Sequence, residues 1–225
     1  MNRIDAIIFD LDGTLIDSEG NYYEADRLLM AEYDISFAPE MKRRFVGVGN
    51  QQMLAVLRAE YQLPDSVEVL LEKKNRLYLE LARKDTRLFP EMGRLLALLR
   101  ERGIKIAVAS GSSREIINEL LQQVGVLGYF TVILSSEEVL HPKPDPDVFL
   151  EAARRLNTSP RHTAVIEDSA FGVDAAVRAE MRCIAIPTFP TPLDPVFRKA
   201  ALLFGDGMDS FRAEKVIEWL EKGCN

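Results

Sequence analysis

The chain of 225 residues has little cysteine, histidine or tryptophan, and it has no long apolar run. Its two cysteines, Cys183 and Cys224, are too few and too far apart for a disulfide framework or a cysteine-rich zinc site, which favours a reducing compartment. No stretch approaches the ~18 apolar residues of a membrane span, and the first residues lack the apolar core of a signal peptide. These absences favour a cytoplasmic protein without a membrane partner.

An excess of positive charge is also missing. The chain has 28 Lys and Arg against 35 Asp and Glu, a formal net charge of −7. Because a broad nucleic-acid surface needs clustered Lys and Arg, nucleic acid is not an expected partner. The composition, 47% hydrophobic and 28% charged, is typical of a globular protein, and the length suits one large domain or a domain with an insertion.

Short apolar, β-prone runs alternate with segments of helical periodicity. The runs cover residues 4–9, 104–109, 132–134, 164–166 and 184–186, and the helical segments cover residues 91–102, 113–124, 147–156, 170–180 and 210–222. Continuous apolar runs between amphipathic helices are typical of a parallel sheet that is covered on both faces. We therefore predict a doubly wound α/β fold.

Residues 19–87 interrupt this alternation. They contain helical patterns at 22–33, 51–61 and 67–83 and no convincing strand. About seventy helical residues are too many for one crossover between neighbouring parallel strands. We predict an α/β core of residues 1–18 and 88–225 and an inserted helical subdomain of residues 19–87.

Polar residues follow four of the predicted strands at their carboxyl ends, where open parallel sheets bind ligands. They are Asp-Leu-Asp-Gly-Thr at 10–14, Ser-Gly-Ser-Ser at 110–113, His-Pro-Lys-Pro-Asp-Pro-Asp at 141–147 and Glu-Asp-Ser at 167–169. Each motif alone could be turn or helix-cap chemistry. Together they bring four carboxylates, several hydroxyls and a lysine to one edge of the sheet, which turn chemistry does not explain.

The charges at this edge predict a metal ion. Asp10, Asp12, Glu167 and Asp168 against Lys143 leave a net charge of −3 when all are ionised. Like charges ~4 Å apart repel by roughly 4 kcal/mol at an effective dielectric constant near 20, so either a cation compensates or some of the acids are protonated. Oxygen ligands without supporting His or Cys favour Mg²⁺, which also binds phosphate oxygens. The edge therefore suits phosphoryl transfer.

The spacing of the first motif assigns roles to its two carboxylates. Residues i and i+2 of an extended chain point to the same side, ~6–7 Å apart. Asp10 can then attack phosphorus while Asp12 exchanges a proton with the leaving or entering oxygen. Gly13 permits a tight turn beside the phosphate, and Ser110 and Lys143 are expected to bind its equatorial oxygens.

These motifs resemble those of the haloacid dehalogenase (HAD) superfamily, in the branch of β-phosphoglucomutase and the small sugar-phosphate phosphatases. The matching segments are residues 10–18 (DLDGTLIDS), 110–112 (SGS), 141–147 (HPKPDPD) and 167–172 (EDSAFG), in the family's order. The resemblance implies a Rossmann-like parallel sheet with a mobile helical cap, here residues 19–87. It also implies a Mg²⁺-dependent phosphatase that works through an aspartyl-phosphate on Asp10.

The resemblance further implies roles for individual residues. The metal ligands would be Asp10, Asp168 and the main-chain carbonyl of Asp12, with Glu167 assisting. The phosphate and substrate ligands would be Ser110, Gly111, Lys143, Asn50 and Lys74. True haloacid dehalogenases and phosphonatases lack an acid at the position of Asp12, so the implied substrates are phosphate esters.

The cap residues bear on whether the enzyme is a phosphatase or a mutase. The mutase has a histidine shortly after the first motif and an arginine in the cap loop, where this chain has Tyr22 and Asn50. These differences favour a phosphatase, with a β-phosphoglucomutase-like phosphomutase as the alternative. Lys74 with Asn75 does resemble the mutase pattern and could bind substrate. A solvated basic turn is an equally good interpretation of Lys74.

A third interpretation is a non-catalytic, receiver-like module that stores a phosphoryl group, but receivers lack the Asp-x-Asp spacing and the long insertion. The expected partner is a small phosphorylated metabolite, foremost a sugar phosphate. We expect a monomer, because a cap can exclude water without a second chain. Cys183 and Trp219 are expected to be buried, and Arg44 is a weaker candidate for substrate binding.

Overall fold

The protein is represented by a computed structural model that describes residues 3–45, 49–188 and 192–223. Contacts divide the chain into two compact units, which we name the core unit (residues 1–17 and 87–225) and the cap unit (residues 18–86). Each predicted boundary lies one residue later along the chain than the corresponding boundary of these units. Cys224 lies outside the described residues.

The core unit is built on a six-stranded parallel sheet with the order β5-β4-β1-β6-β7-β8. The strands are β1 (Ala6–Phe9), β4 (Lys105–Ser110), β5 (Val132–Ser135), β6 (Thr163–Glu167), β7 (Arg182–Ala185) and β8 (Leu202–Leu203). Every residue of β1 is buried, as expected for a central strand covered on both faces. The predicted doubly wound α/β fold is confirmed.

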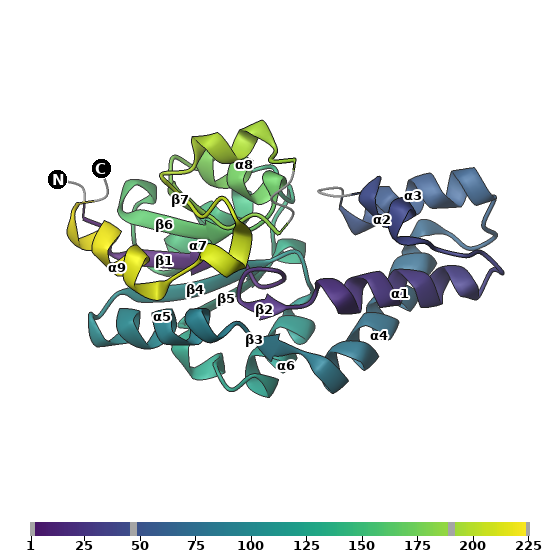
Figure 1. Ribbon diagram of the computed structural model, residues 1–225, viewed down its shortest axis with the longest axis horizontal. Coiled ribbons are helices and arrows are strands. Elements are labelled where there is room, and N and C mark those ends of the chain that lie inside the picture. The colour runs from purple at the N-terminus through teal and green to yellow at the C-terminus, as the bar shows by residue number, and fades with distance from the viewer. Residues whose placement is uncertain (1–2, 46–48, 189–191, 224–225) are drawn as a thin grey trace. The chain divides into compact units, whose positions relative to one another are not determined.

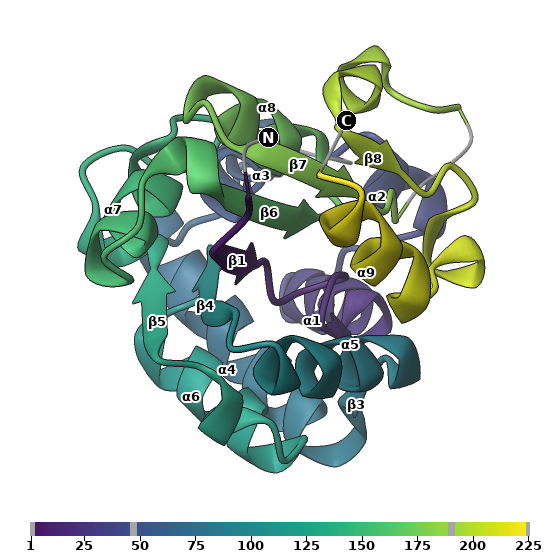
Figure 2. The ribbon, with the colours of Figure 1, turned by 90° about the vertical axis from the view of Figure 1, so that its left-hand side faces the viewer.

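Helices cover both faces of this sheet (Figure 2). They are α5 (Pro90–Glu101), α6 (Arg114–Gln123), α7 (Asp147–Arg155), α8 (Ala170–Arg178) and α9 (Ala213–Glu221). In Figure 2, α7 and α8 lie on one side of the sheet, and α5, α6 and α9 lie on the other. Ile8, Phe149, Val165 and Val173 belong to the buried cluster that joins α7 and α8 to the strands. A buried side chain of this size contributes roughly 1.5–3 kcal/mol, so the packing holds the strand ends in place.

Two very short strands mark the points where the chain leaves the core unit and returns to it. β2 (Ile16–Asp17) and β3 (Arg87–Leu88) pair antiparallel, with Ile16 opposite Leu88 and Asp17 opposite Arg87. A two-residue strand has too few positions for a periodic pattern, so the sequence did not predict these strands or β8.

The cap unit consists of helices in its described residues (Figure 1). They are α1 (Glu19–Ala31), α2 (Pro39–Arg43), α3 (Asn50–Tyr61) and α4 (Val67–Asp85). Leu29, Leu54, Leu57 and Leu70 contribute to its own apolar core. The sequence predicted α1, α3 and α4 but not α2, which has five residues and begins at Pro39. Proline is in fact tolerated in the first turn of a helix, where no intrahelical partner is needed for its nitrogen.

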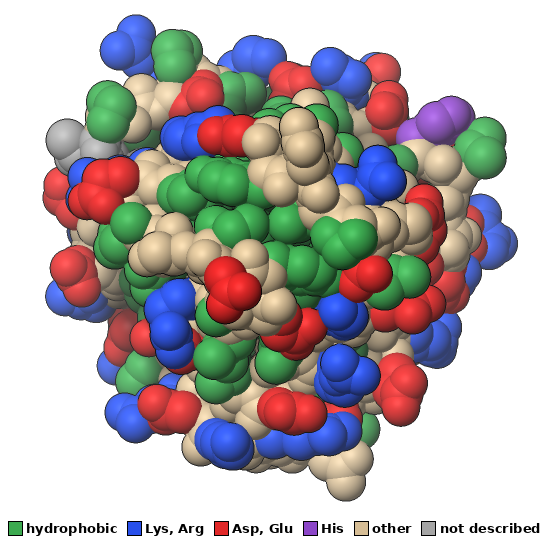
Figure 3. All heavy atoms as spheres, turned by 90° about the vertical axis from the view of Figure 1, so that its right-hand side faces the viewer, with side chains coloured by type: hydrophobic (Ala, Val, Ile, Leu, Met, Phe, Trp, Pro, Cys, Tyr) green, Lys and Arg blue, Asp and Glu red, His purple; other side chains and the backbone are tan. Residues whose placement is uncertain are grey.

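The surface carries charges of both signs. Figure 3 shows one face on which Lys, Arg, Asp and Glu side chains are interspersed around apolar side chains near its middle. Val56 and Val69 of the cap unit are among the exposed large hydrophobic residues. Among the described residues, no helix combines the length and the apolar character needed to cross a bilayer.

Candidate active site

Three of the predicted site residues come from neighbouring strand ends. Asp10 follows β1, while Ser110 and Glu167 are the last residues of β4 and β6. Phe9 of β1 is level with Val108 of β4 and with the residue before Glu167 in β6. The parallel register therefore brings these polar residues to the same edge of the sheet.

Lys143 joins two of the predicted carboxylates. Its Nζ donates to Oδ1 of Asp10 at 2.6 Å, to Oε1 of Glu167 at 2.7 Å and to the carbonyl of Ala109 at 3.3 Å. The Lys143 side chain is 12% exposed, and the Glu167 side chain is 1% exposed. Burial would lower the pKa of Lys143, but the charges of Asp10 and Glu167 outweigh burial and hold it above its ordinary value.

For the Asp10 carboxyl group, burial outweighs the attraction of Lys143. Burial raises the pKa of its carboxyl group to about 8, and the neighbouring Glu167 and Asp12 add to this rise, although Lys143 opposes it. A single ammonium group thus does not fully compensate the surrounding acids. An additional cation at this edge would favour the ionised form of Asp10, which is the form that a nucleophile needs.

Asp12 is held by the serine loop after β4. Its Oδ2 accepts hydrogen bonds from Oγ of Ser112 at 2.9 Å and from Oγ of Ser110 at 3.5 Å. Gly13 turns the chain with φ of 78°, a conformation that favours glycine. Sequence reasoning missed Ser112, although it repeats the Ser110 hydroxyl two residues later. Gly111 between them is exposed.

The Glu167 carboxylate is held by hydrogen bonds from neighbouring groups of the protein. Besides Lys143, its carboxylate accepts hydrogen bonds through Oε2 from the backbone N–H of Asp168 and Ser169, at 2.9 and 2.8 Å, and from Oγ of Ser169. A side chain at Gly172 in α8 would overlap this carboxylate. The arrangement makes Glu167 a fixed partner of Lys143.

Asp168 lies against the loop that follows β1. Oγ1 of Thr14 donates to Oδ1 of Asp168 at 3.1 Å, and Oγ1 of Thr188 donates to Oδ2. A side chain on Gly13 would overlap Asp168, so glycine allows the close approach of loop and carboxylate. The two threonines were not among the residues that the sequence analysis selected.

The oxygen donors at this edge fit a Mg²⁺ ion that takes only one or two carboxylate ligands from the protein. In the part of the chain that the structure describes, no three His, Cys, Asp or Glu side chains are arranged to hold one ion. The carboxylate of Asp12 is turned to the serines, and that of Glu167 to Lys143 and backbone amides. Asp10 accepts from Lys143 through Oδ1, and Asp168 accepts from two threonines, so these two carboxylates carry fewer hydrogen bonds from the protein than Glu167 does. Mg²⁺ is commonly held by one or two carboxylates with waters and substrate phosphate.

The predicted substrate ligands of the cap unit contact each other. Nζ of Lys74 donates to Oδ1 of Asn50 at 2.8 Å and forms an ion pair with Oδ1 of Asp26 at 2.5 Å. Asp26 also pairs with Lys42 at 2.8 Å. Lys74 is fully buried, so its interpretation as part of a solvated turn is wrong. Burial lowers the pKa of Lys74 to about 8, with Lys42 adding to this fall and Asp26 opposing it.

The remaining residues named in the sequence analysis are buried in the core or make ordinary ion-pair and ring contacts. Cys183 is buried in β7 and Trp219 is buried in α9, as expected. Arg44 forms an exposed ion pair with Glu60. Tyr22 stacks on Tyr78 within the cap unit, with 4.1 Å between the ring centroids.

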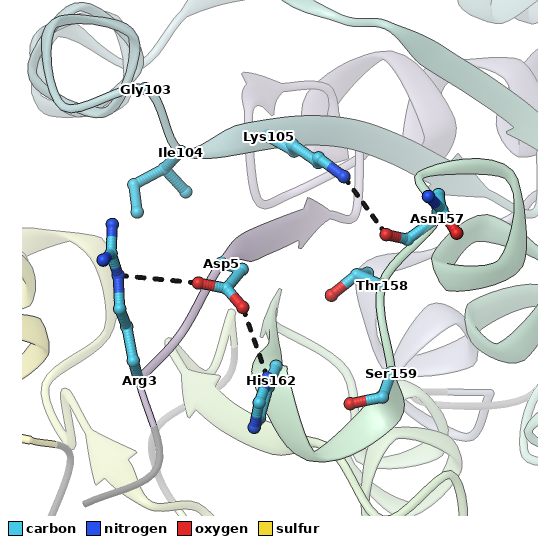
Figure 4. A pocket seen from close by; sticks show the side chains of 9 residues that line it. All are labelled: Arg3, Asp5, Gly103, Ile104, Lys105, Asn157, Thr158, Ser159 and His162. Atoms are coloured by element: carbon cyan, nitrogen blue, oxygen red, sulfur yellow. Dashed lines mark hydrogen bonds and ion pairs between the residues drawn. The ribbon is translucent and has the colours of Figure 1, made fainter.

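A cavity of about 480 Å³ lies at the other end of the core strands (Figure 4). Its lining residues are Arg3, Asp5, Gly103, Ile104, Lys105, Asn157, Thr158, Ser159 and His162. Asp5 pairs with Arg3 and His162 there. Because Asp5 precedes β1 and Lys105 begins β4, the cavity lies at the amino ends of the strands. It contains none of the predicted catalytic residues.

Comparison with known proteins agrees with the geometry at the carboxyl edge. Residues 7–186 match the sequence model of the haloacid dehalogenase-like hydrolases. The chain belongs to this family. The predicted superfamily, fold and enzyme class are thereby confirmed, and the family favours an enzyme over a receiver-like module.

Similar haloacid dehalogenase-like hydrolases cover most of this chain. A "phosphorylated carbohydrates phosphatase" of Thermotoga maritima is 32% identical over 78% of this chain and 82% of its own. "Beta-phosphoglucomutase" of Bacillus subtilis is 33% identical over 80% of this chain and 82% of its own. The crystal structure of a mutant of CbbY from Rhodobacter sphaeroides with xylulose-(1,5)bisphosphate has a TM-score of 0.81 and 28% identity, over 91% of this chain and 95% of that one.

Proposed function

We propose that this hydrolase is a Mg²⁺-dependent phosphatase of small phosphorylated metabolites, foremost sugar phosphates, with Asp10 as the nucleophile. The observation that carries the proposal is the carboxyl-edge cluster, in which Lys143 lies between Asp10 and Glu167 while Asp12 lies beside Ser110 and Ser112. The name of the similar T. maritima protein supports the substrate class.

In the first half of the proposed reaction, a carboxylate oxygen of Asp10 attacks phosphorus as the ester P–O bond breaks. Asp12, in its protonated form, gives its proton to the leaving alcohol oxygen. Lys143 and the Ser110 hydroxyl lie beside the phosphoryl oxygens, where negative charge collects in the transition state. The products of this half are the free alcohol and an aspartyl-phosphate on Asp10.

In the second half, a water molecule attacks the phosphorus of the aspartyl-phosphate. Asp12, now ionised, takes a proton from this water, and the bond between phosphorus and the Asp10 oxygen breaks. Inorganic phosphate leaves and both carboxyl groups return to their starting forms. Glu167 holds Lys143 in place through both halves, because its other oxygen is fixed by backbone amides.

Asp10, Asp168 and the Asp12 carbonyl would hold Mg²⁺ in this proposal, with Glu167 acting through Lys143. When bound, Mg²⁺ supplies positive charge that lowers the pKa of Asp10 and offsets the charge of the phosphoryl group. The raised pKa of Asp10 in the protein alone supports this need for a cation.

A phosphomutase is the second candidate, because the B. subtilis β-phosphoglucomutase is among the similar proteins. A mutase returns the phosphoryl group to sugar instead of water. Tyr22 and Asn50 stand where the mutase pattern has histidine and arginine, and both make contacts inside the cap unit. These two positions favour hydrolysis.

The test is a phosphate-release screen over a panel of sugar phosphates and an activated aryl phosphate, with MgCl₂ or with EDTA. We expect release of inorganic phosphate from several sugar phosphates in Mg²⁺ and none in EDTA. The same samples are analysed for isomerised sugar phosphate, with and without a sugar bisphosphate activator.

Each alternative result has a defined meaning. Isomerised product with little free phosphate would replace the phosphatase by a mutase. No metal-dependent release from any member of the panel would overturn the proposed activity, and a phosphoenzyme that persists for minutes in Mg²⁺ would favour a phosphoryl store.

A further inference from the structure

Asp168 has one hydroxyl donor for each of its carboxylate oxygens. Thr14, from the loop after β1, donates to Oδ1, and Thr188, from the loop after β7, donates to Oδ2. The two threonines are 174 residues apart in the sequence but converge on one side chain. Asp168 itself is buried, with 8% exposure.

Such a pair of donors fixes the plane of a carboxylate. An aspartate side chain rotates broadly about its terminal torsion when nothing holds its oxygens. A hydrogen bond to each oxygen selects one orientation, and an ionised carboxylate oxygen can accept more than one contact. Partners of this kind orient metal ligands and tune the affinity for the ion.

The position of Thr188 does not depend on its hydroxyl group alone. Its backbone N–H donates to the carbonyl of Asp168 at 3.3 Å, and the residue two positions earlier, Ile186, donates to the carbonyl of Glu167 at 2.8 Å. These backbone bonds continue the pairing of β6 and β7 into the loop. Removal of the hydroxyl would therefore take away the donor and leave the loop in place.

We propose that Thr188 is a positioning residue that orients the Asp168 carboxylate for the divalent ion. The inference rests on the proposed function, because it takes Asp168 as a metal ligand. Thr188 acts through Asp168 and does not itself contact substrate. Thr14 completes the arrangement from the loop after β1, so the proposed metal ligand is oriented by residues from both sequence segments of the core unit.

The experiment compares Thr188→Val, which keeps the shape and loses the donor, with Thr188→Ser, which keeps the hydroxyl. Thr158→Val is the matched control, because Thr158 is also a half-buried threonine of the core unit but lines the cavity at the amino ends of the strands. Binding of Mn²⁺ to each full-length protein is measured by electron paramagnetic resonance without substrate.

We expect Thr188→Val to raise the Kd for Mn²⁺ by about 10-fold or more, which is the usual effect of losing a partner of a metal ligand. Thr188→Ser and Thr158→Val should remain within about 2-fold of the unmodified chain. In phosphate release, Thr188→Val should need about 10-fold more Mg²⁺ for half-maximal rate, with little change in the substrate KM at saturating Mg²⁺.

A structural role would give a different pattern. If Thr188→Val lowers the metal-free unfolding temperature and kcat but leaves the Kd for Mn²⁺ unchanged, the proposal is overturned. It is also overturned if Thr188→Ser loses as much metal affinity as Thr188→Val. If the unmodified chain binds Mn²⁺ but releases no phosphate, the phosphatase proposal fails while the binding comparison still decides the role of Thr188. If the unmodified chain binds no divalent ion, both fail.

Discussion

The protein contains two buried lysines whose pKa values move in opposite directions. Lys143 in the core unit lies between Asp10 and Glu167, and these two acids hold its pKa above the ordinary value despite burial. Lys74 in the cap unit shares its ion-pair partner Asp26 with Lys42, and burial lowers its pKa to about 8. Burial disfavours the charged form in both, so the ratio of acids to lysines decides the direction.

The two clusters also have opposite residual charges. When all groups are ionised, Asp10 and Glu167 exceed Lys143 by one negative charge, whereas Lys42 and Lys74 exceed Asp26 by one positive charge. An excess carboxylate is suited to a divalent cation. The cap cluster instead satisfies its lysines internally, through Asp26 and the Asn50 carbonyl oxygen.

The largest effect is expected from Asp10→Asn, which leaves Lys143 with Glu167 as its remaining ion-pair partner in the cluster. We expect phosphate release to fall by ~10⁴-fold or more, because the proposed nucleophile is gone. The unfolding temperature should not fall, since an acid whose pKa burial has raised is removed. Phosphate release and thermal unfolding are measured on the same preparation. Near-normal turnover would refute a covalent step on Asp10.

Removal of the lysines themselves should affect the two units unequally. Lys143→Met leaves Asp10 and Glu167 buried without a counter-charge and should lower the free energy of unfolding by about 3–5 kcal/mol at pH 7. Lys74→Met should change it by less than about 2 kcal/mol, because Lys42 still pairs with Asp26. Urea unfolding of both variants checks this order. Equal losses in the free energy of unfolding would show that the number of acids paired with a lysine does not set the effect of removing it.

A further substitution tests whether Glu167 is held in a fixed position beside Lys143. The side chain of Gly172→Ala would overlap the Glu167 carboxylate and push it away from Lys143. We expect a loss of roughly 1–3 kcal/mol in the free energy of unfolding, although alanine is the better helix former. Gly20→Ala in α1 is the matched control: nothing lies within 4 Å of its added carbon, so it should be neutral or stabilising. Similar urea midpoints for Gly172→Ala and the unmodified chain would argue against a fixed Glu167.

The smallest expected effect is a pH dependence from Lys74. With a folded pKa of about 8 and an ordinary value of 10.5, folded Lys74 loses its proton before unfolded Lys74 does. The unfolded state then binds more protons between these values, so stability rises with pH in that window, by at most about 1.4 kcal/mol per pH unit. Urea unfolding of the unmodified chain and Lys74→Met at pH 7.5, 8.5 and 9.5 should show a growing advantage of the former. A constant advantage over this pH range would mean that Lys74 is held in its charged form.

The sequence predicted the long elements of the fold well. The central strands and α5 to α9 carry strong apolar patterns, and their predicted ranges agree with the structure to within a few residues. It missed β2, β3 and β8, which have two residues each, and α2, which begins at a proline. It also could not give the order of the strands, because crossover segments show that strands are parallel but not which ones are neighbours.

For the candidate site, the sequence predicted which side chains meet and missed how they are held. Asp10, Lys143 and Glu167 were predictable because strand ends of a parallel sheet share an edge. The hydrogen bond from Thr188 to Asp168 and the ion pair between Lys74 and Asp26 depend on contacts between distant segments, and no local pattern signals them. For the same reason Lys74, in a run of charged residues, was expected with equal weight to be solvated, and it is buried.

The pairing of β2 with β3 has a consequence for how this protein can be rebuilt. Residues 16–17 and 87–88 are cross-strand neighbours, so the chain departs from and rejoins the core unit at adjacent points. Excision of the intervening stretch would leave two ends that a short turn could join. A different helical module with closely spaced ends could be inserted there without changing the register of the parallel strands. The β2–β3 pair is therefore a natural junction for exchanging the module between residues 17 and 87.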